Sequence, residues 1–322
     1  MKSLAKPFDY IFLLRPVLFY PVWTVFLAGA VSVHGASQGY GWPQFKIGAP
    51  DGSWGNFWWA LVSYSLLMGT VFILNQLTDI GSDKQNSKLF LIADGHISTE
   101  TAVWEGVIIL VVSFLISLKT SGWFVLVWFF SFLILGVVYS LPPFLWKDRP
   151  IEGLTVNLFG GMTTFFAGWL SVGNPSGAMV FCSLPYIFAV GSVYFLTTVL
   201  DANGDLHSHK ITFAVRYGKQ ATIRMAILFD SIAIILGFLA HDWIVFISAL
   251  VSYFLFVFLI FKSNDLWLNR ITRLPILLLT LMVAFYFPIY FIGIFGIFFV
   301  SKWYYHVRFG LNYPSLNPSQ SN

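Results

Sequence analysis

Long apolar runs, each close to 20 residues, recur along almost the whole of this 322-residue chain. A helix needs about 20 apolar residues to cross the roughly 30 Å hydrocarbon layer of a bilayer. Hydrophobic residues make up 57% of the sequence and charged residues only 10%, against about 25% charged residues in a typical soluble protein. We therefore predict an all-α, polytopic membrane protein that forms a single domain over residues 1–322.

The apolar runs predict about nine membrane-spanning helices. They cover residues 11–33, 56–78, 101–118, 123–141, 153–173, 179–200, 220–240, 241–262 and 276–301. The two runs that meet at His241 and Asp242 could instead form one helix with a break. Pro, Ser and Asn near the C-terminus predict a flexible tail over 302–322. A cleaved signal peptide is an alternative for the first run, but Arg15 and Pro16 interrupt it and favour a retained helix.

Basic residues are unevenly distributed between the two sets of connecting segments. With a cytoplasmic N-terminus, four of the 18 Lys and Arg residues fall in outer segments, and the other fourteen are inner. The outer ones are Lys46, Lys119, Lys302 and Arg308. Because Lys and Arg are retained on the cytoplasmic side, this distribution predicts a cytoplasmic N-terminus. The basic face suits anionic headgroups or an anionic substrate and gives no reason to invoke nucleic acid.

Two aspartate pairs with the same spacing follow the second and the sixth predicted helix. Asp79 and Asp83 form the first pair, and Asp201 and Asp205 form the second. Because both helix numbers are even, both pairs must share one side of the membrane, which the basic residues identify as cytoplasmic. A charged Asp at the bilayer centre costs about 2.5 to 3.5 kcal/mol. We therefore expect each pair at the membrane edge or beside a cationic partner.

Asn75 extends the first pair into a ladder at four-residue spacing. Four residues turn a helix by about 400°, so the three side chains can face one cavity. Carboxylate and amide oxygens suit Mg²⁺, which also binds substrate phosphates. We predict that about two Mg²⁺ ions between the two helices bind a diphosphate and stabilise the charge on the leaving group.

Other side chains fit this chemistry. Basic residues on the same side could donate hydrogen bonds to phosphate, and they are Lys84, Lys88, Lys147, Arg149, Lys210 and Arg216. Aromatic residues make up 19% of the chain and could line an apolar tunnel and stabilise a carbocation through their ring faces. Tyr139, Tyr194 and Phe195 are well placed for this role, although packing or lipid contact would also account for each of them.

The segments around the aspartate pairs resemble the two Asp-rich motifs of the UbiA superfamily of intramembrane prenyltransferases. NQLTDIGSDKQNSKLFLIADGHIS is similar to the first motif, commonly written N-D-x-x-D-x-x-x-D, and DANGDLHSHKITFAVRYGK is similar to the second, D-x-x-x-D. The YSLPP segment and the Arg15–Pro16 pair also resemble family features. The resemblance covers nearly the whole chain. It implies nine helices around a central cavity that opens towards the bilayer under cytoplasmic loops.

The resemblance also implies an activity, the Mg²⁺-dependent transfer of a polyprenyl group from a prenyl diphosphate to a lipophilic acceptor. It implies that Asp79 and Asp83 hold one Mg²⁺ with Asn75 in support, and that Asp201 and Asp205 hold the other. The residues that it implies for the diphosphate are Arg15, Lys88, Lys147 and Lys210. Gln76 departs from the pattern because many members have Asp there, which puts a metal role for this position in doubt.

Several alternatives remain open. We favour an aromatic quinone precursor as the acceptor, but a glyceryl phosphate lipid, a tetrapyrrole or haem would use the same chemistry, and cyclisation or hydrolysis would need no acceptor. A transporter or channel is a different class, since intramembrane carboxylates also mark ion pathways. Such sites tend to lie near the midplane, whereas these pairs lie at helix ends. His207 and His209 could suggest zinc, but no third ligand is evident.

Overall fold

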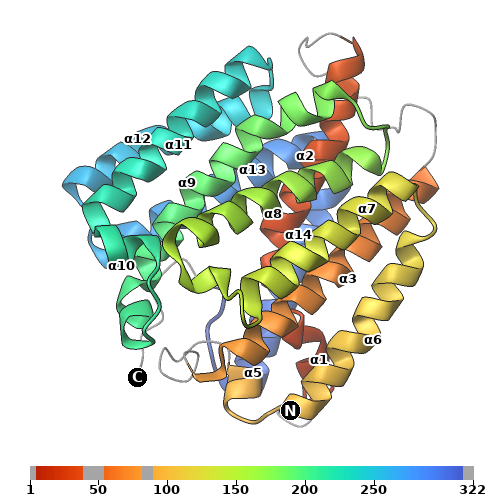
Figure 1. Ribbon diagram of the computed structural model, residues 1–322, viewed down its shortest axis with the longest axis vertical. Helices are drawn as coiled ribbons and strands as arrows, with labels where there is room; N and C mark the ends of the chain where they lie inside the picture. Colours follow the sequence, from red (N-terminus) through yellow and green to blue (C-terminus); the bar gives the residue numbers. More distant parts are fainter. Residues whose placement is uncertain (1–4, 39–53, 82–89, 315–322) are drawn as a thin grey trace.

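Helices form all the regular secondary structure of the computed structural model, which describes residues 5–38, 54–81 and 90–314. The first half contains α1 (Phe8–Leu13), η1 (Pro16–Leu18), α2 (Phe19–Gln38), α3 (Trp54–Thr78), α5 (Phe90–Ala93), α6 (Thr99–Ser117), α7 (Gly122–Ser131), η2 (Phe132–Val138) and η3 (Trp146–Asp148). The second half contains α8 (Pro150–Leu170), α9 (Gly177–His207), α10 (Phe213–Tyr217), α11 (Lys219–Leu239), α12 (Trp243–Phe261), α13 (Asp265–Tyr286) and α14 (Pro288–Phe309). The long helices pack into one bundle (Figure 1).

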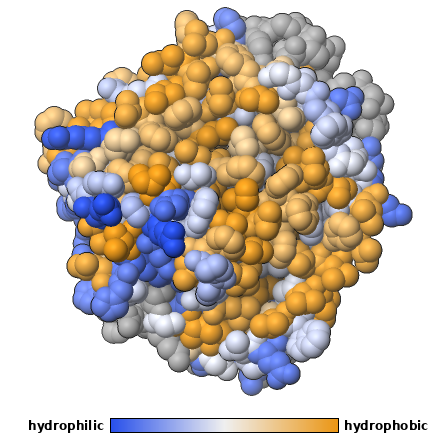
Figure 2. Space-filling view, viewed as in Figure 1, coloured by the Kyte–Doolittle hydropathy of each residue, from blue (hydrophilic) through white to orange (hydrophobic). Residues whose placement is uncertain are grey.

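The outside of this bundle is apolar, as lipid contact requires. Seven spans within the described residues are long and apolar enough to cross a bilayer, with α1, η1 and the start of α2 taken as one. Figure 2 shows apolar residues over most of the visible face. On α6, Trp104 and Ile108 are 60% and 59% exposed, whereas the buried Ser63 and Ser113 bond to each other's backbone carbonyls between α3 and α6. The predicted fold class is confirmed.

The last predicted span, 276–301, is wrong in its bounds. Asn264 caps α13 by accepting a hydrogen bond from the Trp267 backbone N–H, so this helix begins before the apolar run does. It ends at Tyr286, and α14 begins at Pro288. Proline at the first position of a helix loses no hydrogen bond, because that N–H has no partner within the helix. The predicted tail also begins too early, since α14 continues to Phe309.

Helix α14 returns to the side of the bundle where α1 lies. The Arg308 Nη2 atom lies 3.0 Å from Oδ2 of Asp9, and the buried Tyr304 hydroxyl donates to Oδ1 of the same carboxylate. The prediction that Arg308 lies opposite the N-terminal segment is therefore wrong. The same correction applies to Lys302 in the final turns of α14, and it increases the excess of basic residues on the side of α1.

The run around His241 and Asp242 is a connection between two separate helices. His241 adopts a left-handed backbone conformation with φ 49°, which ends α11. Asp242 then caps α12 by accepting hydrogen bonds from the backbone N–H groups of Ile244 and Val245. The alternative of one interrupted helix is therefore wrong. With this turn, each of the first eight predicted spans overlaps a separate helical segment, the first covering α1 to α2 and the fourth covering α7 and η2.

Two glycines allow α2 and α8 to pack closely at the centre of the bundle. A Cβ atom on Gly168 would lie 1.7 Å from the backbone oxygen of Phe26, and one on Gly29 would lie 2.1 Å from that of Phe165. No side chain fits at either point, because both contacts are with backbone. Helix α8 also packs against α9, and this arrangement holds the segment before α8 beside the C-terminal turns of α9.

Candidate active site

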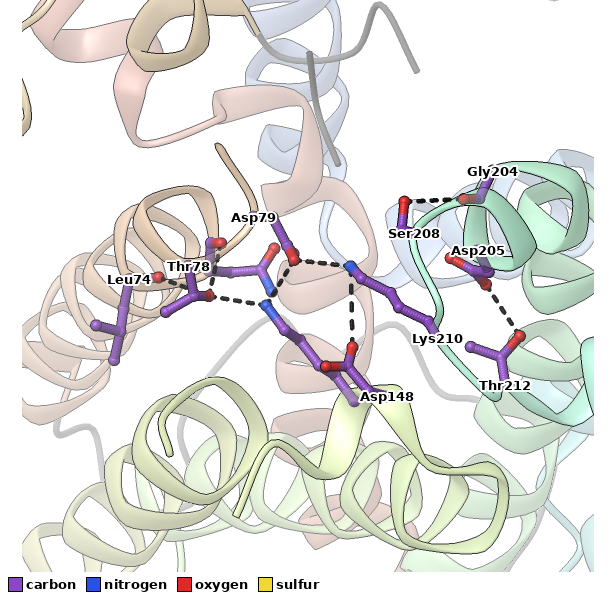
Figure 3. A network of polar contacts seen from close by, with 11 residues as sticks. Leu74, Thr78, Asp79, Asp148, Gly204, Asp205, Ser208, Lys210 and Thr212 are labelled. Carbon is purple, nitrogen blue, oxygen red and sulfur yellow. Dashed lines mark hydrogen bonds and ion pairs between the residues drawn. The ribbon is translucent and has the colours of Figure 1, made fainter. Parts of the chain in front are cut away.

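The ends of α3 and α9 bring acidic residues of both motifs to one region of the bundle. Asp79 directly follows α3, and its backbone N–H donates to the Asn75 carbonyl at 3.0 Å. Asp201 and Asp205 lie in the last two turns of α9, which is longer than the predicted span. Figure 3 shows Asp79 and Asp205 on the two sides of Lys210, with Asp148 next to this lysine.

Two lysines contact the same carboxylate oxygen. Oδ1 of Asp79 accepts a hydrogen bond from Lys210 Nζ at 2.7 Å and lies 2.8 Å from Lys147 Nζ. Lys147 comes from η3 and also donates to the Thr78 hydroxyl at 2.8 Å. Lys210 comes from the segment after α9. Three connections that are distant in sequence therefore meet at Asp79.

Burial and charge oppose each other at this contact. Burial raises the pKa of the Asp79 carboxyl, but the ammonium groups of Lys147 and Lys210 outweigh it, and the pKa lies below its ordinary value. Burial lowers the pKa of Lys147, and Asp79 only partly compensates. Burial also acts to lower the pKa of Lys210, but here Asp79 outweighs it and the pKa is raised. Asp79 is therefore a carboxylate at neutral pH.

Asp148 is a member of this cluster that the sequence analysis missed. Its Oδ1 atom lies 3.9 Å from Lys210 Nζ, which is too far for a hydrogen bond, and this buried atom has no hydrogen-bond partner. Burial raises the pKa of the Asp148 carboxyl although Lys210 and Lys147 oppose the change. A buried acceptor without a partner costs about 1 to 3 kcal/mol. A bound cation or hydrogen-bond donor would remove this cost.

Asp205 fixes the segment that carries Lys210. Its Oδ2 atom accepts a hydrogen bond from the Thr212 hydroxyl at 2.9 Å, and its backbone oxygen accepts one from the Lys210 N–H at 2.9 Å. The Ile211 N–H in turn donates to the Asp148 backbone oxygen at 3.0 Å. These bonds join the end of α9 to the segment before α8 and direct Lys210 towards Asp79.

The other predicted site residues are more scattered. Asp83, Lys84 and Lys88 lie outside the described residues. Arg15 has a left-handed backbone conformation at the break between α1 and η1, where it acts electrostatically on Tyr305 and Tyr313.

Two further predicted basic residues, Arg149 and Arg216, each contact a side chain that is close to them in the sequence. Arg149 lies 3.7 Å from Glu152, and the Arg216 guanidinium lies over the Tyr217 ring, 5.7 Å from its centroid. Both contacts are local, so neither carries these side chains towards Asp79.

Gln76 faces the contact between α3 and α1. This buried side chain donates hydrogen bonds to the Leu13 carbonyl at 2.8 Å and to the Phe72 carbonyl at 3.1 Å. Leu13 is the last residue of α1, where carbonyl groups lack partners within the helix. Gln76 therefore joins two helices, a packing role that accounts for it without a metal.

Tyr139 and Tyr194 lie near a cavity of about 200 Å³ inside the bundle. Tyr194 and Asn157 line this cavity, and the Tyr139 hydroxyl lies next to the Asn157 side chain. Gly153 makes room for Tyr194, because a Cβ atom there would lie 2.5 Å from the tyrosine Oη. Phe195 instead packs in the core against Phe213 and Phe229, so its predicted place in a tunnel is wrong.

The described residues contain no group of three His, Cys, Asp or Glu side chains placed to hold a metal ion. His207 is exposed, and its Nδ1 atom lies 2.6 Å from the Asn203 backbone oxygen. The described residues therefore give no support to a zinc site at His207 and His209. For Mg²⁺, Asp83 lies outside the described residues, and the oxygen of Asp79 is in contact with two lysines.

Known proteins with related sequences are prenyltransferases. A 2-acylphloroglucinol 4-prenyltransferase from Humulus lupulus is 27% identical over 179 residues, which is 52% of this chain and 43% of that protein. A probable homogentisate phytyltransferase 2 from Oryza sativa subsp. japonica is 27% identical over 176 residues, which is 50% of this chain and 46% of that protein. The chain thus spans less than half the length of these relatives.

Solved structures share the fold over more of the chain. A UbiA homolog from Archaeoglobus fulgidus bound to GPP and Mg²⁺ has a TM-score of 0.68 at 21% identity, covering 89% of this chain and 99% of that one. A digeranylgeranylglyceryl phosphate synthase has a TM-score of 0.63 at 16% identity, covering 90% and 99%. A model of the UbiA prenyltransferase family matches residues 47–274. This chain belongs to the UbiA prenyltransferase family.

Proposed function

We propose that this protein transfers a prenyl group from a prenyl diphosphate to a hydroxylated aromatic acceptor, with Mg²⁺ as the cofactor. The observation that carries the proposal is the convergence of Asp79, Asp148 and Asp205 with two lysines at the ends of α3 and α9. Related enzymes are named for phloroglucinol, coumarin and homogentisate substrates, which supports an aromatic acceptor. A quinone precursor is the narrower choice within this class.

The donor atoms at this site fit a hard cation. The motif residues offer carboxylate and amide oxygens, which are the ligands that Mg²⁺ takes. The buried Asp148 oxygen without a partner is a further acceptor at the same place. In our proposal Asn75, Asp79 and Asp83 hold one ion, and Asp201 and Asp205 hold the other. When bound, Mg²⁺ neutralises the diphosphate oxygens and stabilises the leaving group.

The side chains of this protein bind the diphosphate and protect the reacting carbon. Lys147 and Lys210 are within reach of one point, since both contact Asp79 Oδ1, and we propose that they exchange this contact for phosphate oxygens. Tyr139 and Tyr194 are half-buried between the polar cluster and the cavity, where their rings exclude water from the carbocation and stabilise it. We propose that the N-terminus and this site face the cytoplasm.

The test is transfer by the purified protein in lipid nanodiscs. Labelled geranyl diphosphate and Mg²⁺ are incubated with an acylphloroglucinol, a hydroxycoumarin, homogentisate or a glyceryl phosphate lipid, and products are identified by mass spectrometry. We expect a prenylated aromatic product that requires Mg²⁺ and is lost in Asp79→Ala. Asp265→Asn changes an exposed carboxylate at the start of α13 and serves as the control. In proteoliposomes, movement of the intact donor into the lumen without product would favour the transporter.

A further inference from the structure

Asp230 is a second buried carboxyl group, and it lies apart from the polar cluster. It is in the middle of α11, only 2% exposed, and it lines the cavity. Its carboxyl lies next to Ser192 of α9, and its buried Oδ2 atom has no hydrogen-bond partner. Ionisable residues within membrane-spanning helices are costly and mark functional sites by default. Asp230 therefore needs an explanation that packing does not give.

The cavity has a polar wall in an otherwise largely apolar lining. Ser192, Asp230, Ser248 and Ser252 lie on this wall. Ser248 and Ser252 each donate their hydroxyl hydrogen to a carbonyl of α12 at 2.7 Å, and Ser192 donates to the Ala189 carbonyl of α9 at 2.8 Å. All three serines therefore offer lone pairs rather than donors. Asp230 Oδ2 consequently lacks a donor, and a hydroxyl group on a molecule in the cavity would supply one.

The size of the cavity suits one aromatic ring. A cavity of about 150 Å³ is large enough to bind benzene, and this one measures about 200 Å³. Tyr194 and Asn157 also line it, and Asn157 connects through Tyr139 to the region of the polar cluster. A ring here can direct one edge towards the diphosphate site and the other towards Asp230.

The depth of Asp230 fits this orientation. Ser192, which lies next to Asp230, precedes Asp201 by nine residues on α9. This separation corresponds to about 13 Å along the helix axis. The reacting carbon of the acceptor must approach the donor near the Asp201 end. The far edge of a hydroxylated ring then lies close to Asp230. A prenyl chain consists only of hydrocarbon and would leave the carboxyl without a partner.

We propose that Asp230 binds a hydroxyl group on the ring of the aromatic acceptor. This inference rests on the proposed function. A site built to hydrogen-bond a substrate hydroxyl rejects an analogue that lacks it, because the buried polar group is left without a partner. Asp230 is thus a specificity-determining residue. It acts at the edge of the acceptor away from the reacting carbon.

The kinetic test compares Asp230→Leu with Asp230→Asn and the surface control Asp265→Asn. With an acylphloroglucinol and geranyl diphosphate, we expect Asp230→Leu to raise the acceptor KM about tenfold or more, which corresponds to about 1.4 kcal/mol. The donor KM and the Mg²⁺ requirement should not change. Asp230→Asn keeps one oxygen acceptor and should lie between the wild type and Asp230→Leu. An increase confined to the donor KM would assign this wall to the prenyl chain and overturn the proposal.

A binding measurement separates this inference from the proposed function. The wild type should bind the acylphloroglucinol at least about tenfold more tightly than the phenyl ketone with the same acyl group and no ring hydroxyls, and this preference should disappear in Asp230→Leu. Equal binding of the two compounds by the wild type would overturn the inference, even if transfer occurs. A hydroxyl preference that depends on Asp230, without transfer to any aromatic acceptor, would contradict the proposed function alone. If Asp230→Leu does not fold, Asp230→Asn carries both measurements.

Discussion

The Nζ atom of Lys210 lies 2.7 Å from the Oδ1 atom of Asp79, although 131 residues separate the two in the sequence. The contact joins the segment after α9 to the end of α3, and Lys147 reaches the same oxygen from η3. The geometry of this charged cluster therefore depends on how three interhelical segments are held together.

Lys210 should contribute to binding the donor. Removing one partner of a buried charge pair costs about 2 to 5 kcal/mol, so we expect Lys210→Met to lower kcat/KM for geranyl diphosphate by about tenfold or more. Lys210→Arg keeps the charge and should retain more activity. Steady-state kinetics with varied donor at saturating Mg²⁺ measure both variants. An unchanged kcat/KM for the donor in Lys210→Met would remove Lys210 from the diphosphate site.

Asp148 should matter for the metal although it lies outside both motifs. Its unpartnered oxygen beside Lys210 predicts that Asp148→Asn raises the Mg²⁺ concentration needed for half-maximal activity by several-fold. Titration of activity with Mg²⁺ measures this change. The matched control is Glu100→Gln, which removes an exposed carboxylate in the first turn of α6. Identical titration curves for wild type and Asp148→Asn would limit Asp148 to a structural role.

Gln76 should affect stability rather than metal binding. Gln76→Leu leaves the Leu13 carbonyl without its donor, and an unsatisfied buried acceptor costs about 1 to 3 kcal/mol. We expect a lower Tm in detergent, measured by a fluorescence-based thermal unfolding assay, and an unchanged Mg²⁺ requirement. A shifted Mg²⁺ requirement with the same Tm would return Gln76 to the metal site.

Gly153 should be essential for the position of Tyr194. The Cβ atom of Gly153→Ala would lie 2.5 Å from Tyr194 Oη, so the ring must move and activity should fall. Adding Tyr194→Phe removes the clashing oxygen and should restore part of that activity, which a double-mutant cycle measures. Gly177→Ala, where nothing lies within 4 Å, is the control. Independent effects of the two changes would show that the clash does not limit activity.

The sequence predicts those features of the fold that depend on local hydropathy. Eight spans and the placement of Asp79 and Asp205 at one end of the bundle follow from apolar length and helix parity. The break before Pro288 could not be predicted in this way, because apolar residues flank it on both sides and no polar turn marks it. The start of α13 was also missed, since Arg270 and Arg273 interrupt the apolar pattern while the Asn264 cap begins the helix earlier.

Tertiary packing determines the rest of the candidate site. Asp148 stands between Lys147 and Arg149 in the sequence, where a solvated loop is the simplest interpretation. Only its contacts with the segment after α9 bring it into the charged cluster. A role for Asp230 could not be predicted either, because the position of a single carboxylate in an apolar run does not show whether it faces lipid or a cavity. Its role follows from neighbours on α9 and α12 that the sequence alone does not bring together.

The ion pair between Asp9 and Arg308 also constrains the order of assembly during synthesis. A separation of 299 residues means that every helix from α2 to α13 has been translated before the partner of Asp9 exists. Until then this carboxylate and the Phe12 ring, which stacks on Tyr304, lack their final contacts. The first helix can contact α3 earlier, through the Gln76 bond to the Leu13 carbonyl, but it gains its ion pair only from α14. Premature termination before α14 would leave an apolar surface exposed for quality control to recognise.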